Sequence, residues 1–199
     1  MSALMDVMFR PMLTVFVLTA IATAVAMLLP PARGLVPLAL LLDSVPFGGV
    51  VAATVIATIR LRRVPLPPIR LLIAVYGYFA GALVGTLGLT HLVAVLIVSI
   101  DRARQHQFVY SFHFYSLVLL GMLLIAAGLM AAIESVRLAR GHRAAWRVSL
   151  SVWTTILAIN LPLVSLQGFA VLFSVLAAVE LLLLVSMRRR FDVKSAGDT

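Results

Sequence analysis

Three polar side chains stand inside long apolar runs of this sequence: Asp43, Asn160 and Glu180. A charged or strongly polar group at membrane depth is costly, so such residues usually pair with one another or serve a function. Asp43 precedes Pro46 and Asn160 precedes Pro162. A proline inside a helix frees carbonyl groups, which must find partners in the protein or in a wet cavity. The pattern predicts two interrupted helices, an arrangement that surrounds the binding site in many transporters.

Position along the helices places both polar groups toward the same membrane face. At helical rise, Asp43 lies about 12 Å inward from Leu35, and Asn160 lies about 9 Å from the outer end of its own run. Together with Gln167, in the short turn that follows, they predict a polar pocket toward the outer face that binds a small solute. The alternative is that the two prolines are unrelated, because prolines are common in membrane helices.

Two acids remain nearer the opposite face. Glu180 lies about 10 Å from the inner edge at Met187. It is either a buried acid that is hydrogen-bonded within the bundle or a group that couples transport to a proton or another cation. Glu134 stands three residues before Arg137. This spacing predicts an ion pair across one helical turn.

Several kinds of chemistry are excluded or lack a motif. The chain has no cysteine, which excludes disulfides, thiolate nucleophiles, iron–sulfur clusters and cysteine-based zinc sites. No nucleophile elbow, zinc-protease, Walker A or dinucleotide motif is present. His91 and His113 could ligate a haem, but both fall near run ends, where interfacial histidines are expected. We expect no enzyme, no cofactor and no metal site.

Six apolar runs must position these residues. The chain has 199 residues, of which 63% are apolar and 12% are charged. A bilayer accepts so much apolar surface on the outside of a helix bundle, and about 20 residues cross it. We therefore predict an all-α, polytopic membrane helix bundle that forms a single integral membrane domain over 1–199. Its six transmembrane helices are expected at about 11–29, 35–59, 71–90, 112–136, 148–166 and 169–187.

The third apolar stretch, residues 71–100, is too long for one upright crossing and too short for two. Two alternatives stay open for it. It is either a tilted helix, or a span that ends near Gly88 and continues as an interfacial segment.

Basic residues are unequally divided between the two sides of these runs. Alternating crossings place thirteen of the 16 Lys and Arg residues on one side, and only Arg33, Arg102 and Arg104 on the other. Short loops rich in Lys and Arg stay in the cytoplasm. The N and C termini are therefore expected in the cytoplasm, with the protein in a bacterial cytoplasmic (inner) membrane. Because the basic residues cap apolar runs, they suit lipid phosphates, and we expect no nucleic-acid partner.

Glycines recur every fourth residue in the third run, at Gly77, Gly81 and Gly85. This spacing creates a smooth helix face to which another backbone can pack closely. The neighbour is either a helix of the same chain or a partner membrane subunit. Gly88 is off this spacing, so we expect a leucine at Gly81 to disturb assembly more than a leucine at Gly88.

In length and topology, six spans in 199 residues with cytoplasmic ends resemble the substrate-capture subunits of energy-coupling-factor vitamin transporters. The resemblance implies solute binding toward the outer face and packing through small residues of the first helix. It rests on no motif and assigns no residue a role. The leading hypothesis is a small-solute transporter or its membrane-embedded substrate-binding subunit. The alternatives are a non-catalytic assembly subunit of a larger membrane complex and, third, an intramembrane enzyme.

Overall fold

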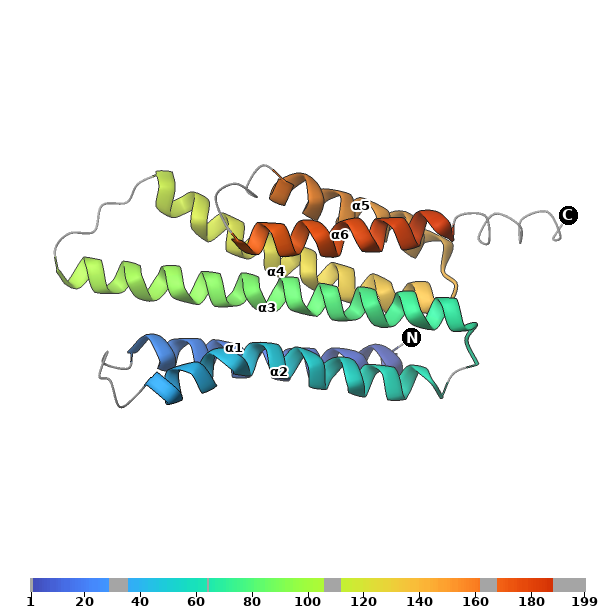
Figure 1. Ribbon diagram of the computed structural model, residues 1–199, viewed down its shortest axis with the longest axis horizontal. Helices are drawn as coiled ribbons and strands as arrows, with labels where there is room; N and C mark the ends of the chain where they lie inside the picture. The colour runs from blue at the N-terminus through green and yellow to red at the C-terminus, as the bar shows by residue number, and fades with distance from the viewer. Residues whose placement is uncertain (1, 29–35, 64, 106–111, 162–167, 188–199) are drawn as a thin grey trace, which may run out of the picture. The chain divides into compact units, whose positions relative to one another are not determined.

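A computed structural model describes residues 2–28, 36–63, 65–105, 112–161 and 168–187. This part of the chain contains helices and no strand, which confirms the all-α prediction (Figure 1). The six helices are α1 (Ser2–Leu28), α2 (Val36–Leu61), α3 (Pro68–Arg104), α4 (Phe112–Ala139), α5 (Arg143–Asn160) and α6 (Gly168–Ser186).

Four of these helices are long and apolar enough to cross a membrane, as expected of an integral membrane protein. The qualifying segments are Phe9–Leu28, Ser44–Leu61, Pro68–Arg104 and Phe114–Ala139. α6 contributes a shorter apolar segment, Ala170–Ser186. α5 begins with arginines and carries several Ser and Thr residues, which lowers its hydropathy. The crossings by α5 and α6 therefore stay predictions.

The helices contribute to two compact units, which are described separately. Unit 1 comprises residues 1–56 and 82–128, and unit 2 comprises residues 57–81 and 129–199. α1 belongs wholly to unit 1, whereas α5 and α6 belong wholly to unit 2.

In unit 1, α2 runs without a break through Pro46, so the predicted interruption of this helix is wrong. A proline removes one helix hydrogen bond, which a membrane helix tolerates when its neighbours support it. Gly49, three residues after Pro46, allows α1 to pack closely against this helix. A Cβ atom placed on Gly49 would lie 3.1 Å from Val15 Cγ1 of α1. The predicted break at Pro162 lies outside the described residues, so it stays a prediction; the described helix α5 ends at Asn160.

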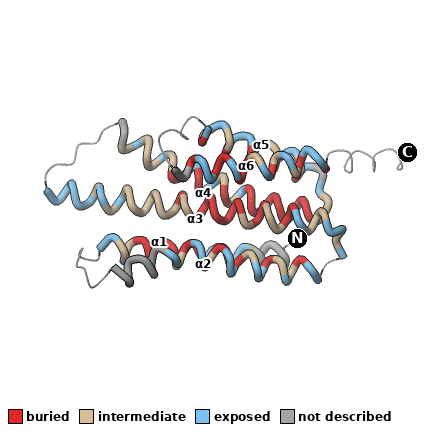
Figure 2. The backbone as a smooth tube through the Cα atoms, in the orientation of Figure 1, coloured by how far each residue is buried: buried red, intermediate tan, exposed pale blue. Residues whose placement is uncertain are grey.

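α3 is a single helix of 37 residues, with no end near Gly88. Its length of about 55 Å exceeds the hydrocarbon thickness of a bilayer. Burial is confined to its first part: buried residues occur between Ile73 and Gly88, and none of the residues 89–104 is buried (Figure 2). No proline follows Pro68 in this run, and a glycine within a helix costs only about 1 kcal/mol. The continuous-helix alternative therefore describes α3.

In unit 2, α5 and α6 lie side by side and run in opposite directions (Figure 1). Trp146 Nε1 of α5 donates a hydrogen bond of 2.9 Å to the Leu184 carbonyl of α6. The Tyr76 hydroxyl of α3 donates one of 3.2 Å to the Leu176 carbonyl. α6 is thus held by side-chain hydrogen bonds from two other helices of the unit.

One end of unit 2 gathers four helix ends, and those of α3, α4 and α5 carry arginines. The first residues of α3 and α5 and the last residues of α4 and α6 lie together there (Figure 1). At the end of α4, Gly141 has a φ of 80°. The amides of Gly141 and His142 bond the Leu138 and Arg137 carbonyls, which is the Schellman arrangement that ends a helix. A Cβ atom on Gly141 would lie 3.2 Å from Arg70 Nη1, so the start of α3 reaches this turn.

Candidate functional site

The most buried acid of unit 2 lies where three helices meet. Glu180 of α6 is 1% exposed, and Ser135 of α4 is 2% exposed. Both side chains lie against Gly77 of α3. A Cβ atom placed on Gly77 would lie 2.7 Å from Glu180 Oε1 and would also collide with Ser135 Oγ. The bare backbone of Gly77 therefore makes the room that the carboxyl group and the hydroxyl group occupy.

The hydrogen bonds around this cluster are incomplete. Ser135 Oγ donates to the Ala131 carbonyl of its own helix at 2.7 Å. Glu180 Oε2 is buried and has no hydrogen-bond partner among the described residues. Within the same part of the chain, no cation forms an ion pair with Glu180. A buried carboxyl group without these partners is costly, and such a group in a membrane helix is a candidate functional group.

Glu134, one residue before Ser135, has a different environment. Its Oε1 accepts a hydrogen bond of 2.6 Å from Arg137 Nη1 in an ion pair, which confirms the prediction from their spacing. Glu134 is 2% exposed, whereas the Arg137 side chain is 39% exposed. The pair therefore brings a buried acid into contact with a cation that reaches the surface near the end of α4.

The described structure does not test whether the residues predicted to bind a solute lie together. Asn160 is buried at the end of α5, and its Nδ2 donates a 2.8 Å hydrogen bond to the Ile156 carbonyl. This bond gives one N–H of the amide a partner within its own helix. Asp43 lies in α2, but its side chain is outside the described structure, and so is the whole of Gln167. The predicted outer pocket therefore stays a prediction.

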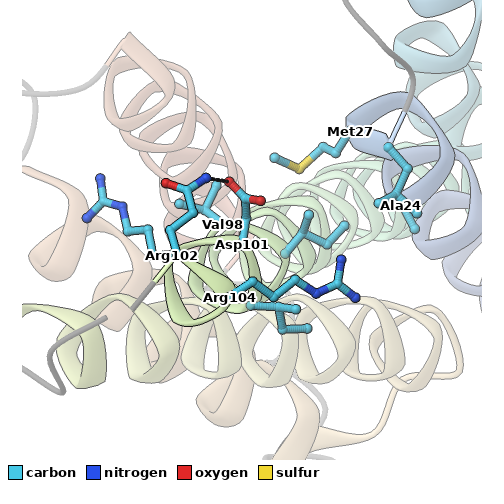
Figure 3. Close-up of a pocket in the computed structure, with 10 residues that line it drawn as sticks. Ala24, Met27, Val98, Asp101, Arg102 and Arg104 are labelled. Atoms are coloured by element: carbon cyan, nitrogen blue, oxygen red, sulfur yellow. Dashed lines mark hydrogen bonds between the residues drawn. The ribbon is translucent and has the colours of Figure 1, made fainter. Parts of the chain in front are cut away.

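Unit 1 contains an open pocket of about 570 Å³ between the ends of α1 and α3 (Figure 3). Asp101 to Arg104 form the last turn of α3. Gln105 Nε2 donates a 3.0 Å hydrogen bond to Asp101 Oδ2. Arg104 extends toward the α1 residues and Arg102 points away from them (Figure 3). All of these charged groups are exposed, so water screens them and their attraction for an ion is weak.

The glycines of α3 make close contacts with helices of the same chain. Gly77 contacts the cluster described above, and a Cβ atom on Gly85 would lie 2.8 Å from Phe16 Cζ. Gly81 is buried. Gly88, expected to lie off the packing face, is equally close to a neighbour: a Cβ atom there would lie 2.7 Å from Leu124 Cβ and 3.0 Å from the Ile125 backbone nitrogen.

Gly121 of α4 explains why Gly88 packs so closely. A Cβ atom on Gly88 would lie 3.2 Å from the Gly121 carbonyl oxygen, so two glycines face each other at this crossing. Two bare backbones allow helices to approach closely in a membrane. Gly121 in α4 was the sequence feature that could have indicated this close crossing. The four-residue glycine spacing within α3 did not include Gly88.

The histidines show no sign of a metal site in the described structure. The His91 ring nitrogen Nε2 lies 3.2 Å from the Leu117 carbonyl of α4. The side chain of His113 is outside the described residues. In the part of the chain that the structure describes, no group of three His, Asp or Glu residues is placed to hold a metal ion.

Comparison with protein-family models, with curated proteins and with solved structures finds no match to this chain. No relative therefore assigns a role to any residue, and the functional argument rests on the geometry given above.

Proposed function

We propose that this protein transports a small solute across a membrane, or is the membrane-embedded substrate-binding subunit of such a transporter, with Glu180 as its ion-coupling group. The observation that carries the proposal is the position of Glu180, which is 1% exposed in a chain of apolar helices and forms no ion pair among the described residues. Acids retained at such depth serve proton and cation relays in transporters.

The geometry supports coupling in a second way. The carboxyl group of α6 lies against α3 at Gly77 and against α4 at Ser135. Its solvation therefore depends on how tightly three helices pack. A change in that packing would alter the free energy of charging the acid, which is how binding of a proton or cation becomes linked to a conformational change. In this proposal Asp43, Asn160 and Gln167 remain the residues expected to bind the solute.

The assembly-subunit alternative has less support. It depended on a glycine face of α3 that is free to dock a partner subunit. Gly77, Gly85 and Gly88 instead have close neighbours from helices of the same chain. These contacts favour the role of the glycines in packing within the protomer. No catalytic step is part of the proposal.

The proposal is tested by solute-dependent proton flux. The purified protein is reconstituted in liposomes that contain a pH-sensitive dye, and amino acids, sugars, nucleosides and organic cations are added in turn. We expect at least one solute to drive flux through the wild type, and Glu180→Gln to lower that flux by about tenfold or more, which corresponds to a transport barrier higher by at least about 1.4 kcal/mol.

Glu134→Gln is the matched control. Glu134 is as buried as Glu180, but it is paired with Arg137 near a helix end. We expect this variant to retain the flux. If Glu180→Gln inserts and folds but moves protons and solute as the wild type does, Glu180 is not the coupling group.

A further inference from the structure

In the described part of unit 2, a set of buried polar atoms lacks hydrogen-bond partners among the described residues. Apart from the second oxygen of the ion-paired Glu134, they are Trp153 Nε1, Ser149 Oγ, Ser174 Oγ and Glu180 Oε2. All four residues are buried, and Trp153 is 0% exposed. Buried indole N–H groups and hydroxyls normally find a partner in the protein or in ordered water. Four unpartnered groups in one unit therefore need a common explanation.

Measured along the helix axes, the four groups fall within one band of the α5–α6 pair. The two helices are antiparallel, and the hydrogen bond from Trp146 to Leu184 fixes their register. From this level, Ser149 lies about 4.5 Å along α5, and Trp153 lies about 10 Å along it. Glu180 lies about 6 Å along α6 from the same level, and Ser174 lies about 15 Å along it. The band is thus about two helical turns tall.

Their chemistry is complementary to water. The indole group can only donate, an ionised carboxylate can only accept, and each hydroxyl can do both. A water molecule donates two hydrogen bonds and accepts two, so a few waters can satisfy the whole set. A metal cation would leave the indole N–H unpartnered, because that group has no lone pair to offer. Internal waters are found where buried polar groups lack protein partners.

We propose that internal water molecules occupy this band and hydrogen-bond to Trp153, Ser149 and Ser174, solvating the Glu180 carboxyl group. The link from these waters to ion coupling rests on the proposed function of Glu180. The presence of the waters does not, because it follows from the unpartnered atoms alone. Waters in this band would give the Glu180 carboxyl group hydrogen-bond partners that the three helices around Gly77 do not provide.

The two tryptophans of the chain make this proposal measurable. Protein labelled with ¹⁵N-tryptophan in lipid nanodiscs gives two indole N–H signals, and Trp146→Phe assigns them. Bound water is detected as cross-peaks between the water resonance and an indole proton, with opposite signs in laboratory-frame and rotating-frame experiments. We expect such cross-peaks at Trp153, although its side chain is fully buried.

A second measurement uses the two serines, whose change to alanine leaves almost the same volume. If water bridges the band, Ser149→Ala and Ser174→Ala each remove a hydrogen bond, and the melting temperature falls. In a dry band, the same changes remove an unsatisfied polar group and leave the melting temperature unchanged or higher. Thr155→Ala is a matched control, since its hydroxyl bonds its own helix at Ser151 and is exposed.

A Trp153 signal without water cross-peaks, together with serine variants that keep or raise the melting temperature, would overturn the inference. That outcome is independent of the flux measured with Glu180→Gln. If the band is dry and Glu180→Gln loses flux, the inference of internal water is wrong and the coupling role of Glu180 stands. If the band is hydrated and the flux of Glu180→Gln is unchanged, the coupling role is wrong and the internal water stands.

Discussion

The contact between Gly77 and Glu180 depends on the absence of a side chain at residue 77. The carboxyl group fits beside α3 only because Gly77 lacks a side chain, since a Cβ atom would lie 2.7 Å from Glu180 Oε1. The Ser135 hydroxyl lies against the same position, so a side chain at residue 77 would collide with both groups. Gly77 therefore allows both the close packing of α3 and the burial of the Glu180 carboxyl group.

We expect Gly77→Ala to destabilise the protein by about 1–3 kcal/mol, because an overpacked position forces its neighbours to shift. The measurement is thermal unfolding in detergent. Gly48→Ala is the control: it is also a helical glycine, but a Cβ atom there meets nothing within 4 Å. The free energy of unfolding of that variant is expected to rise by up to about 1 kcal/mol, because alanine has a higher helix propensity than glycine. Equal stability of the two variants would contradict the close contact at Gly77.

At this scale the sequence predicted only what lies within one helix. Glu134 and Arg137 are one turn apart, so their ion pair followed from spacing. The isolation of Glu180 in an apolar run was also visible. Its neighbours Gly77 and Ser135 belong to two other helices, and no local pattern indicates which turns of distant helices will meet. The partners of Glu180 could therefore not be predicted.

At the scale of elements, helix continuity was harder to predict than helix position. Pro46 indicated a break in α2, yet the helix continues, because one lost hydrogen bond does not outweigh the bonds on either side. The length of α3 was ambiguous because no residue after Pro68 is a strong helix breaker. The close crossing of α3 and α4 needed glycines from both helices, and a pattern in one helix could not show it.

We expect Gly88→Ala to destabilise the protein by about 1–3 kcal/mol in the same unfolding assay, through overpacking of the α3–α4 crossing. The atoms in the way include the Ile125 nitrogen and the Gly121 carbonyl oxygen. Both are backbone atoms, so no side-chain rotation relieves the contact. If Gly88→Leu disturbs assembly less than Gly81→Leu, as the sequence alone predicted, the two helices separate easily at this crossing.

For the whole molecule, the prediction of a membrane helix bundle and of its orientation rested on composition and on the placement of arginines. The chain is 63% apolar, and its described part has four helices with the length and composition of membrane spans. The sequence also predicted that most arginines share one side. In unit 2, the helix ends that bear Arg70, Arg137, Arg140 and Arg147 do lie at one end. Arginine-rich ends face the cytoplasm by the positive-inside rule, so the orientation of the protein stays a prediction.

The orientation is tested with single cysteines, which are easily introduced because the chain has none. We expect a cysteine at Gln105, just after α3, to react in intact cells with a membrane-impermeant thiol reagent. A cysteine at His142, in the turn between α4 and α5, should react only after the membrane is permeabilised. Both positions are exposed, so neither result depends on burial. The opposite pattern would reverse the orientation and place the arginine-rich end of unit 2 outside. Labelling of both residues in intact cells would mean that α4 does not cross the membrane.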